Sequence, residues 1–308
     1  MKITRILCLM ALILSVAVQA EAKKVKLQYQ LKAGDQFKYE MSATQDIAQE
    51  VMGQSQTTKV NTSSTYDFKV IGVTAAGEFS MSAAMVAYSM SSVTPMGEMK
   101  YNSETDTVVP DFAKSSAAAL NQYYTFTLSP MGKITGMTAP DGLVDKVTKI
   151  AEEQAGGQMQ MGGGAAAGVT AEGFQKTMES MIFTFPDGGA DLKKPWEQQS
   201  TINQMLALKV AAKFELVKAS EEANEIKLTA QISQDPSAPP MEMQGMNLTY
   251  ELLGAKEGTM ILDPATGLIK TLDAATTISG TITIDSPQLP SPMSIPMTVN
   301  SKEKITKK

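Results

Sequence analysis

Residues 139–195 constrain the fold most, because they interrupt a sequence that otherwise has the alternating pattern of β-strands. Two short segments within this interruption have a helical pattern, Asp141–Glu153 and Thr170–Met181, and the Gly/Met/Ala-rich run Gly156–Gly168 separates them. The strand-rich stretches on either side share landmarks in the same order. The pattern predicts an α+β fold that is mainly β, with two strand-rich halves and helices between them.

The first twenty residues have the organisation of a secretory signal peptide. Lys2 and Arg5 precede an apolar run from Ile6 to Val18, which is shorter than a membrane-spanning helix requires. Small or apolar residues at the −3 and −1 positions predict cleavage after Ala20, and a second site follows two residues later. We therefore expect a periplasmic or secreted mature protein without an integral membrane span.

Cleavage would remove the one cysteine, Cys8, and the one arginine, Arg5, and the chain contains no histidine. The mature protein would then lack disulfides, thiolate nucleophiles, Cys/His zinc sites and every His-based catalytic triad. Its formal charge would change from −5 to −7, because Lys2 and Arg5 are lost. An acidic chain without a basic patch predicts no nucleic-acid binding. We expect no cofactor and no enzymatic activity.

Five landmarks recur in the two β halves and suggest an internal duplication. One pair of segments is Asp67–Ile71 and Lys213–Val217, and another is Phe126–Ile134 and Met260–Ile269. In the second pair a strand ends in Leu, and a Pro and a Gly follow in a turn. The predicted organisation is a signal peptide at 1–20, an N-terminal β half at 21–138, a helical insert with a mobile Gly/Met/Ala loop at 139–194 and a C-terminal β half at 195–308.

The second helical segment carries an apolar stripe on one face. Thr170 can cap its amino end, and the stripe repeats at helical spacing. Small residues within the long strands permit strong curvature, so we expect curved antiparallel sheets in an open or half barrel, with both helices on the concave side. The stripe would then line a pocket for an apolar ligand. Its residues are Phe174, Met178, Met181 and Ile182.

The phrase Tyr29-x-Leu31-x-x-Gly34-Asp35-x-Phe37-x-Tyr39 resembles the opening of uncharacterised exported β-rich proteins of Bacteroidetes-type bacteria. Those families often carry a Trp near a strand start in their second half, as Pro195-Trp196 does here. The Gly-Asp that usually precedes that Trp is replaced by Lys193-Lys194. The resemblance implies export and a domain of unknown function, and it carries no known activity over to this chain. The expected architecture is also similar to lipoprotein-carrier folds, which are half barrels with a helical lid over an apolar cavity.

Three patterns suggest other chemistry. Met241, Met243 and Met246 have the character of a Cu(I)-binding thioether cluster, although alternate methionines on a strand are also typical of one packed face. Ser301 and Lys304 have the Ser-x-x-Lys spacing of serine acyltransferases, but that motif requires a helix start, and a terminal strand is expected here. The sequence alone does not test for the paired carboxylates of a hydrolase, because only the fold brings two such side chains together.

The composition and pattern favour an exported, non-catalytic cell-envelope protein that binds an apolar ligand, such as a lipid or acyl chain, inside a curved sheet. The alternative is an interaction or structural module that contacts an envelope protein partner. A large apolar cavity favours the first hypothesis, and a filled core with an exposed apolar patch favours the second. Copper binding and a carboxylate-based hydrolase are the weaker alternatives.

Overall fold

The computed structural model describes residues 24–51, 53–95, 97–155, 167–203, 207–235, 241–243, 246–286 and 291–308. The expected signal peptide at 1–20 and all but the end of the run Gly156–Gly168 lie outside these residues. No helix in the described part of the chain is long and apolar enough to cross a membrane.

The described part of the chain forms one antiparallel sheet of thirteen strands. The first six strands are β1 Gln36–Val51, β2 Gln54–Val73, β3 Phe79–Thr94, β4 Gly97–Asn102, β5 Tyr124–Leu128 and β6 Ile134–Thr138. The other seven are β7 Pro195–Asn203, β8 Ala207–Ala219, β9 Asn224–Gln234, β10 Met241–Met243, β11 Met246–Leu262, β12 Ile269–Asp285 and β13 Met293–Lys307. The prediction of a mainly β fold is confirmed.

The strand order is β6-β5-β3-β2-β1-β13-β12-β11-β9-β8-β7, with β4 paired to β3 and β10 paired to β11. The order of β1, β2, β3, β5 and β6 is therefore repeated by β7, β8, β9, β11 and β12, whereas the short strands β4 and β10 differ because they pair with β3 and β11. The strand β13 pairs with both β12 and β1. The turns at Pro130–Gly132 and Pro264–Gly267 join equivalent strands of the two halves, β5 to β6 and β11 to β12. This is the arrangement that an internal duplication predicts.

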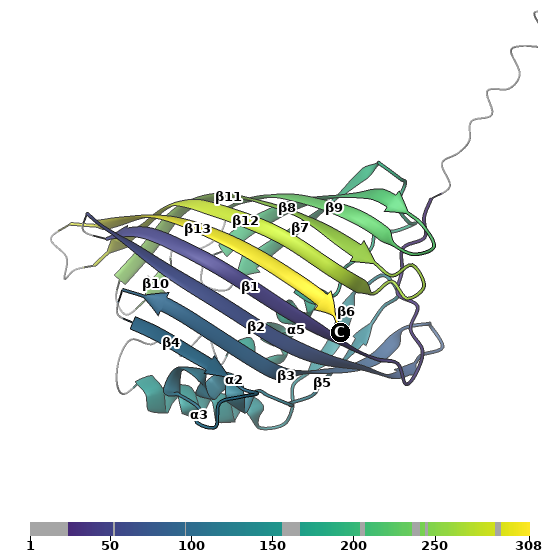
Figure 1. Ribbon diagram of the computed structural model, residues 1–308, viewed down its shortest axis with the longest axis horizontal. Coiled ribbons are helices and arrows are strands. Elements are labelled where there is room, and N and C mark those ends of the chain that lie inside the picture. The colour runs from purple at the N-terminus through teal and green to yellow at the C-terminus, as the bar shows by residue number, and fades with distance from the viewer. Residues whose placement is uncertain are drawn as a thin grey trace, which may run out of the picture.

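The sheet is strongly curved but is not closed into a barrel, because β6 and β7 end the strand order without pairing to each other. Figure 1 shows that β1, β2, β13 and β12 form the front of the molecule, while β5 to β9 and the helix α5 lie behind them. We call the surface that faces α5 the inner face. Alternate residues of each strand point to it, beginning with Phe37 and Tyr39 on β1.

Three α-helices accompany the sheet in the described residues, at α2 Lys114–Ala118, α3 Leu143–Ala155 and α5 Ala171–Met181. The two helices expected from the sequence are present, and Thr170 caps α5 by accepting a hydrogen bond from the nitrogen of Gly173 at 3.0 Å. The helix α2 and the 3-10 turn before it, Asp111–Ala113, were not predicted. The helix α5 lies on the inner face, where Phe174 contacts Tyr66 of β2.

The helix α5 lies on the concave side as expected, and α3 contributes to the same core while it also has a helical neighbour. The helix α3 packs against α2, and Figure 1 places the pair beside β3 and β4 at one edge of the sheet. Its buried residues, Leu143 and Val147, belong to the same hydrophobic core as the buried residues of α5.

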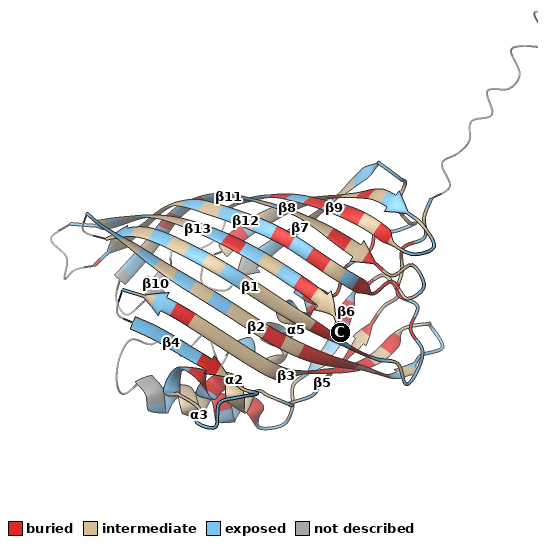
Figure 2. Ribbon diagram, viewed as in Figure 1, coloured by how far each residue is buried: buried red, intermediate tan, exposed pale blue. Residues whose placement is uncertain are grey.

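The main core lies at one end of the inner face, and Figure 2 shows buried positions concentrated toward that end of the long strands. It combines α5 and the strands with a segment before β1, from which Leu27, Tyr29 and Leu31 are buried. The hydroxyl of Tyr29 accepts a hydrogen bond from the nitrogen of Phe183 at 2.8 Å. This hydrogen bond gives the buried hydroxyl of Tyr29 a polar partner.

Candidate ligand-binding site on the inner face of the sheet

A second hydrophobic cluster lies on the inner face beyond the main core, toward the other ends of the strands. Its buried members come from β8, β9 and β11, and partly buried side chains from β8, β11, β12 and β13 surround them. We call this set the second cluster. It contains Leu208, Val210, Ile232, Leu248, Tyr250, Leu252, Ile278, Ile282 and Met297.

The strand registers explain why these residues share one face. Ile278 pairs with Val299 of β13 and with Gly254 of β11, and Gly254 pairs with Ile232 of β9. Directly paired residues in an antiparallel sheet point to the same side, and positions two residues apart continue that side along the strand. An apolar surface therefore runs across β8, β9, β11, β12 and β13 with part of its side-chain area exposed.

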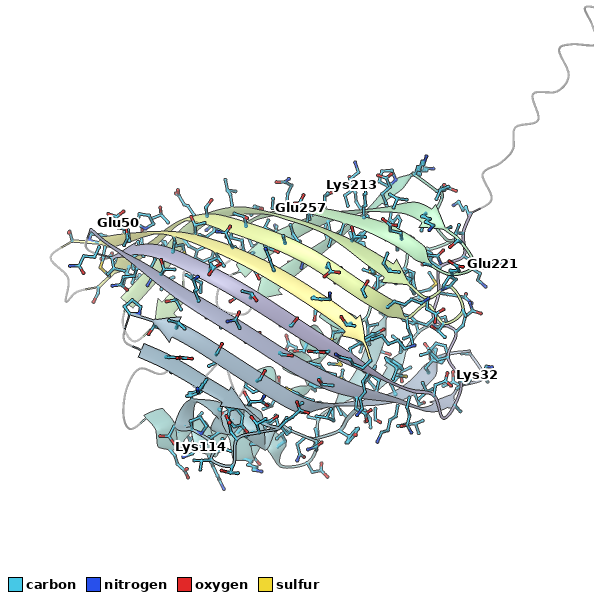
Figure 3. The ribbon with its side chains drawn as sticks, viewed as in Figure 1. Lys32, Glu50, Lys114, Lys213, Glu221 and Glu257 are labelled. Atoms are coloured by element: carbon cyan, nitrogen blue, oxygen red, sulfur yellow. The ribbon has the colours of Figure 1, made fainter. Side chains whose placement is uncertain are left out.

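A polar band separates the second cluster from the main core. It centres on an ion pair in which Lys256 Nζ of β11 lies 2.6 Å from Glu303 Oε2 of β13. The two side chains keep 24% and 37% of their area exposed. Among the described inner-face positions of β8, β9, β11, β12 and Met293 to Ile305 of β13, these two residues are the charged ones. Their neighbours Glu257 and Lys304 point outward, and Figure 3 shows Glu257 on the outer side.

Two hydroxyl groups beside the ion pair have no hydrogen-bond partner. Thr276 pairs in register with Lys256 on one side and with Ser301 on the other, so the three side chains lie in one row of the inner face. The oxygens Thr276 Oγ1 and Ser301 Oγ are buried without a partner, and Ser301 is only 7% exposed. Buried polar atoms are nearly always paired, so two adjacent exceptions indicate a place that can receive a hydrogen-bonding group.

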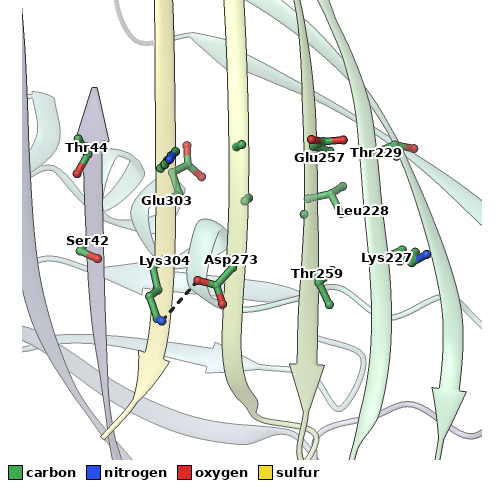
Figure 4. Close-up of a pocket in the computed structure, with 14 residues that line it drawn as sticks. Ser42, Thr44, Lys227, Leu228, Thr229, Glu257, Thr259, Asp273, Glu303 and Lys304 are labelled. Carbon is green, nitrogen blue, oxygen red and sulfur yellow. Dashed lines mark ion pairs between the residues drawn. The ribbon is translucent and has the colours of Figure 1, made fainter. Parts of the chain in front are cut away.

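One described pocket is a shallow, open hollow of about 700 Å³ in which outward-pointing residues of β1, β13, β12, β11 and β9 predominate. Its charges alternate in sign, with Lys227, Lys302 and Lys304 opposed by Glu257 and Asp273. Figure 4 shows the ion pair between Lys304 and Asp273, whose atoms lie 3.6 Å apart. Alternating, solvated charges of this kind are typical of a soluble outer surface and select no particular ligand.

The helical stripe predicted as a ligand pocket belongs mainly to the main core. Met178, Met181 and Ile182 are buried there, so they stabilise the packing of α5 on the sheet. Phe174 is buried too, stacks on Tyr124 with ring centroids 3.7 Å apart, and also lines a pocket of about 220 Å³ between α2 and α5. Ligand binding at these four residues remains a prediction.

Three aromatic residues, Tyr66, Tyr124 and Phe174, line that smaller pocket. The hydroxyl of Tyr124 donates to the carbonyl oxygen of Val169 at 2.7 Å, and burial raises its pKa to about 12. Burial also raises the pKa of Tyr66 to about 12. Both hydroxyls therefore stay neutral at physiological pH and act as fixed hydrogen-bonding groups rather than as acids.

The remaining candidates from the sequence do not form a described catalytic or metal site. The backbone places Met243 opposite Met246 in the β10–β11 hairpin, but the side chains of Met241, Met243 and Met246 lie outside the described part. Ser301 and Lys304 occupy β13, where positions three apart point to opposite faces. Within the described residues, no three His, Cys, Asp or Glu side chains gather as metal ligands would.

Residues 76–269 match a family of unknown function, DUF6263, and the chain belongs to that family. No curated protein matched the sequence. Among solved structures, the chain is similar to a lipovitellin structure titled for its lipid–protein interactions, with 10% identity and a TM-score of 0.47. The match covers 91% of this chain and spans 25% of the lipovitellin chain. OccK11 (OpdR) of Pseudomonas aeruginosa matches with 7% identity and a TM-score of 0.16 over 91% of this chain and 99% of that chain.

Sequence reasoning missed Lys256, Glu303, Thr276 and Ser301 as a group. A signal was present, because Lys256 occupies the inward position of an alternating strand, between Gly254 and Gly258. A charged residue in the apolar series of a strand marks either an ion pair or a binding site.

Proposed function

We propose that the protein is exported and binds an apolar ligand, such as a lipid or acyl chain, on the inner face of its curved sheet without catalysing a reaction. The observation that supports this function most directly is the second cluster. Its partly exposed apolar side chains lie on the inner face, away from the main core that α5 fills. Burying methylene groups against such a surface contributes about 0.8 kcal/mol for each group.

The inner face is long enough to hold an extended acyl chain. From Ser301 to Met293, five inward positions of β13 span about 26 Å, at roughly 3.3 Å for each residue. The hydrocarbon core of a bilayer is about 30 Å thick and holds two chains end to end, so one chain needs about 15 Å. One acyl chain therefore fits along the inward side chains of this part of β13 and its neighbours.

The test is a titration of the mature chain with diphenylhexatriene, an uncharged hydrocarbon whose fluorescence rises in an apolar environment. We expect saturable binding that Ile278→Gln weakens at least tenfold, because Ile278 belongs to the second cluster. The matched control is Ile71→Gln on β2, where the side chain is 61% exposed and outside both clusters. Circular dichroism checks that both variants remain folded, and a wild-type protein that shows no saturable binding contradicts the proposed function.

A second candidate is contact with an envelope protein partner, which the exposed apolar side chains of Ile71 and Val73 at the end of β2 support. A photo-crosslinking amino acid at position 71 tests it in cells. A discrete crosslinked product that is absent with the same group at Lys100 favours this candidate, and its absence argues against it.

A further inference from the structure

The ion pair of Lys256 and Glu303 determines which kind of polar head the inner face can accept. Lys256 Nζ and Glu303 Oε2 are 2.6 Å apart, so each charge already has its counter-charge. A carboxylate or ammonium group placed beside the pair would gain no free opposite charge. It would also lose water, and the desolvation of an ion is expensive unless the ion is paired. An uncharged head avoids this cost.

The row next to the pair offers hydrogen bonds instead of charge. Thr276 and Ser301 each carry a hydroxyl that can donate one hydrogen bond and accept others. Both oxygens are buried and unpartnered in the structure, and a hydroxyl or carbonyl oxygen that approaches them would satisfy them. Glycerol and ester groups supply these partners without a net charge.

The polar row also has a defined relation to the apolar surface. Ile278 follows Thr276 by two residues on the inward side of β12, and Val299 precedes Ser301 by two residues on β13. A ligand whose head contacts the row therefore places its first methylene groups directly on the second cluster. The separation of polar row and apolar surface matches the separation of head and chain in an amphiphile.

We propose that the inner face binds a single-chain amphiphile with an uncharged head that carries hydroxyl or ester groups, as in a monoacylglycerol. The head lies beside Lys256, Glu303, Thr276 and Ser301, and the chain lies along the second cluster. This inference rests on the proposed function, since it assumes that an apolar chain binds there at all.

The test compares three ligands with the same 18-carbon chain for their ability to displace diphenylhexatriene at pH 8. They are 1-monooleoylglycerol, oleate and oleylamine. We expect monooleoylglycerol to bind at least tenfold more tightly than either charged ligand. Ser301→Ala should weaken monooleoylglycerol about threefold or more while it leaves diphenylhexatriene unchanged.

Variants that remove one charge of the ion pair test whether Lys256 and Glu303 cause the preference for an uncharged head. Glu303→Gln leaves Lys256 with an unpaired positive charge, so the preference should shift toward oleate. Lys256→Met leaves Glu303 negative and should shift the preference toward oleylamine. The double variant, Lys256→Met with Glu303→Gln, restores neutrality and should restore the preference for monooleoylglycerol, which also controls for general damage to the fold.

The outcomes separate this inference from the proposed function. Saturable binding of diphenylhexatriene together with equal affinity for the three heads overturns the uncharged-head inference and leaves the proposed function intact. Tighter binding of oleate than of monooleoylglycerol by the wild type also overturns it. If diphenylhexatriene and all three ligands fail to bind, the proposed function and this inference fall together.

Discussion

The backbone nitrogen of Tyr29 donates a hydrogen bond to the carbonyl oxygen of Pro130 at 2.7 Å, and the next residue makes the matching bond to the other half of the sheet. The nitrogen of Gln30 donates to the carbonyl oxygen of Thr266 at 2.9 Å. Pro130 and Thr266 belong to the equivalent turns of the two halves. A single segment before β1 thereby holds both turns and covers one end of the inner face.

These turns depend on glycine where they meet other backbone segments. Gly267 has a φ of 74°, and a Cβ there would lie 2.2 Å from the carbonyl oxygen of Gln28. We expect Gly267→Ala to lower the free energy of unfolding by about 3 kcal/mol, because backbone strain and a steric clash add together. Urea denaturation measures this change.

The control for that prediction is Gly34→Ala. Gly34 has a φ of 90°, but nothing lies within 4 Å of the added Cβ, so we expect a loss of about 1 kcal/mol from strain alone. Equal losses for the two variants would show that the contact between Gly267 and Gln28 contributes nothing.

Met178 tests how tightly α5 is packed on the sheet. Its side chain is fully buried in the main core. Met178→Lys should therefore unfold the protein or lower its stability by more than about 4 kcal/mol, because an unpaired charge would be buried. Met178→Leu should cost less than about 1.5 kcal/mol. A Met178→Lys variant that keeps nearly the wild-type stability in thermal denaturation would contradict this packing. The control is Glu179→Lys on the exposed side of α5.

The carboxylate of Glu40 links stability to acid pH. Its hydrogen bond to Lys308 lowers its pKa below the usual 4.5. Because the pKa is lower in the folded state than in the unfolded state, the stabilisation is present above about pH 4.5. It is lost as the pH falls below that value. Lys308→Met should remove about 0.5 kcal/mol at pH 7 and nothing at pH 2, since both side chains are partly exposed.

Urea denaturation at the two pH values checks this difference. Lys100→Met, at an exposed position on β4, is the matched loss of a positive charge. The assignment fails if Lys308→Met and Lys100→Met change stability equally at pH 7.

Export is tested by the amino terminus of the protein in cells. Cleavage after Ala20 or two residues later predicts a mature chain that begins at Glu21 or Lys23. Amino-terminal sequencing of protein from the envelope fraction measures it directly. A chain that still begins at Met1 would contradict the proposed localisation.

Local sequence patterns predicted most of the helices and strands, but they did not predict what each one packs against. Alternation identified the strands, and Thr170 with its following stripe identified α5, because these signals depend on neighbouring residues alone. The helix α2 was missed because its five residues, Lys114–Ala118, are too few to show a periodic pattern. The contact between α3 and α2 depended on that missed helix, so this contact could not be predicted.

The candidate site was missed for a different reason. Lys256 and Glu303 are 47 residues apart in sequence, and they meet only because β12 lies between their strands with a definite register. Register across three strands depends on the pairing of the whole sheet, which no single segment encodes. The stripe from Phe174 to Ile182 was correctly identified as apolar, but its burial depends on the segment around Tyr29 and on the strands beneath it.

The position of β13 has a consequence for the order of events during biogenesis. Its residues pair with β1 over sequence separations from 248 residues, between Gln49 and Met297, to 268 residues, between Tyr39 and Lys307. The strands β1 to β6 and the strands β7 to β12 can each pair early, but the sheet has a gap between β1 and β12 until β13 pairs with both. A chain that crosses a membrane amino end first would thus remain incomplete, and accessible to chaperones and proteases, until its final residues emerge.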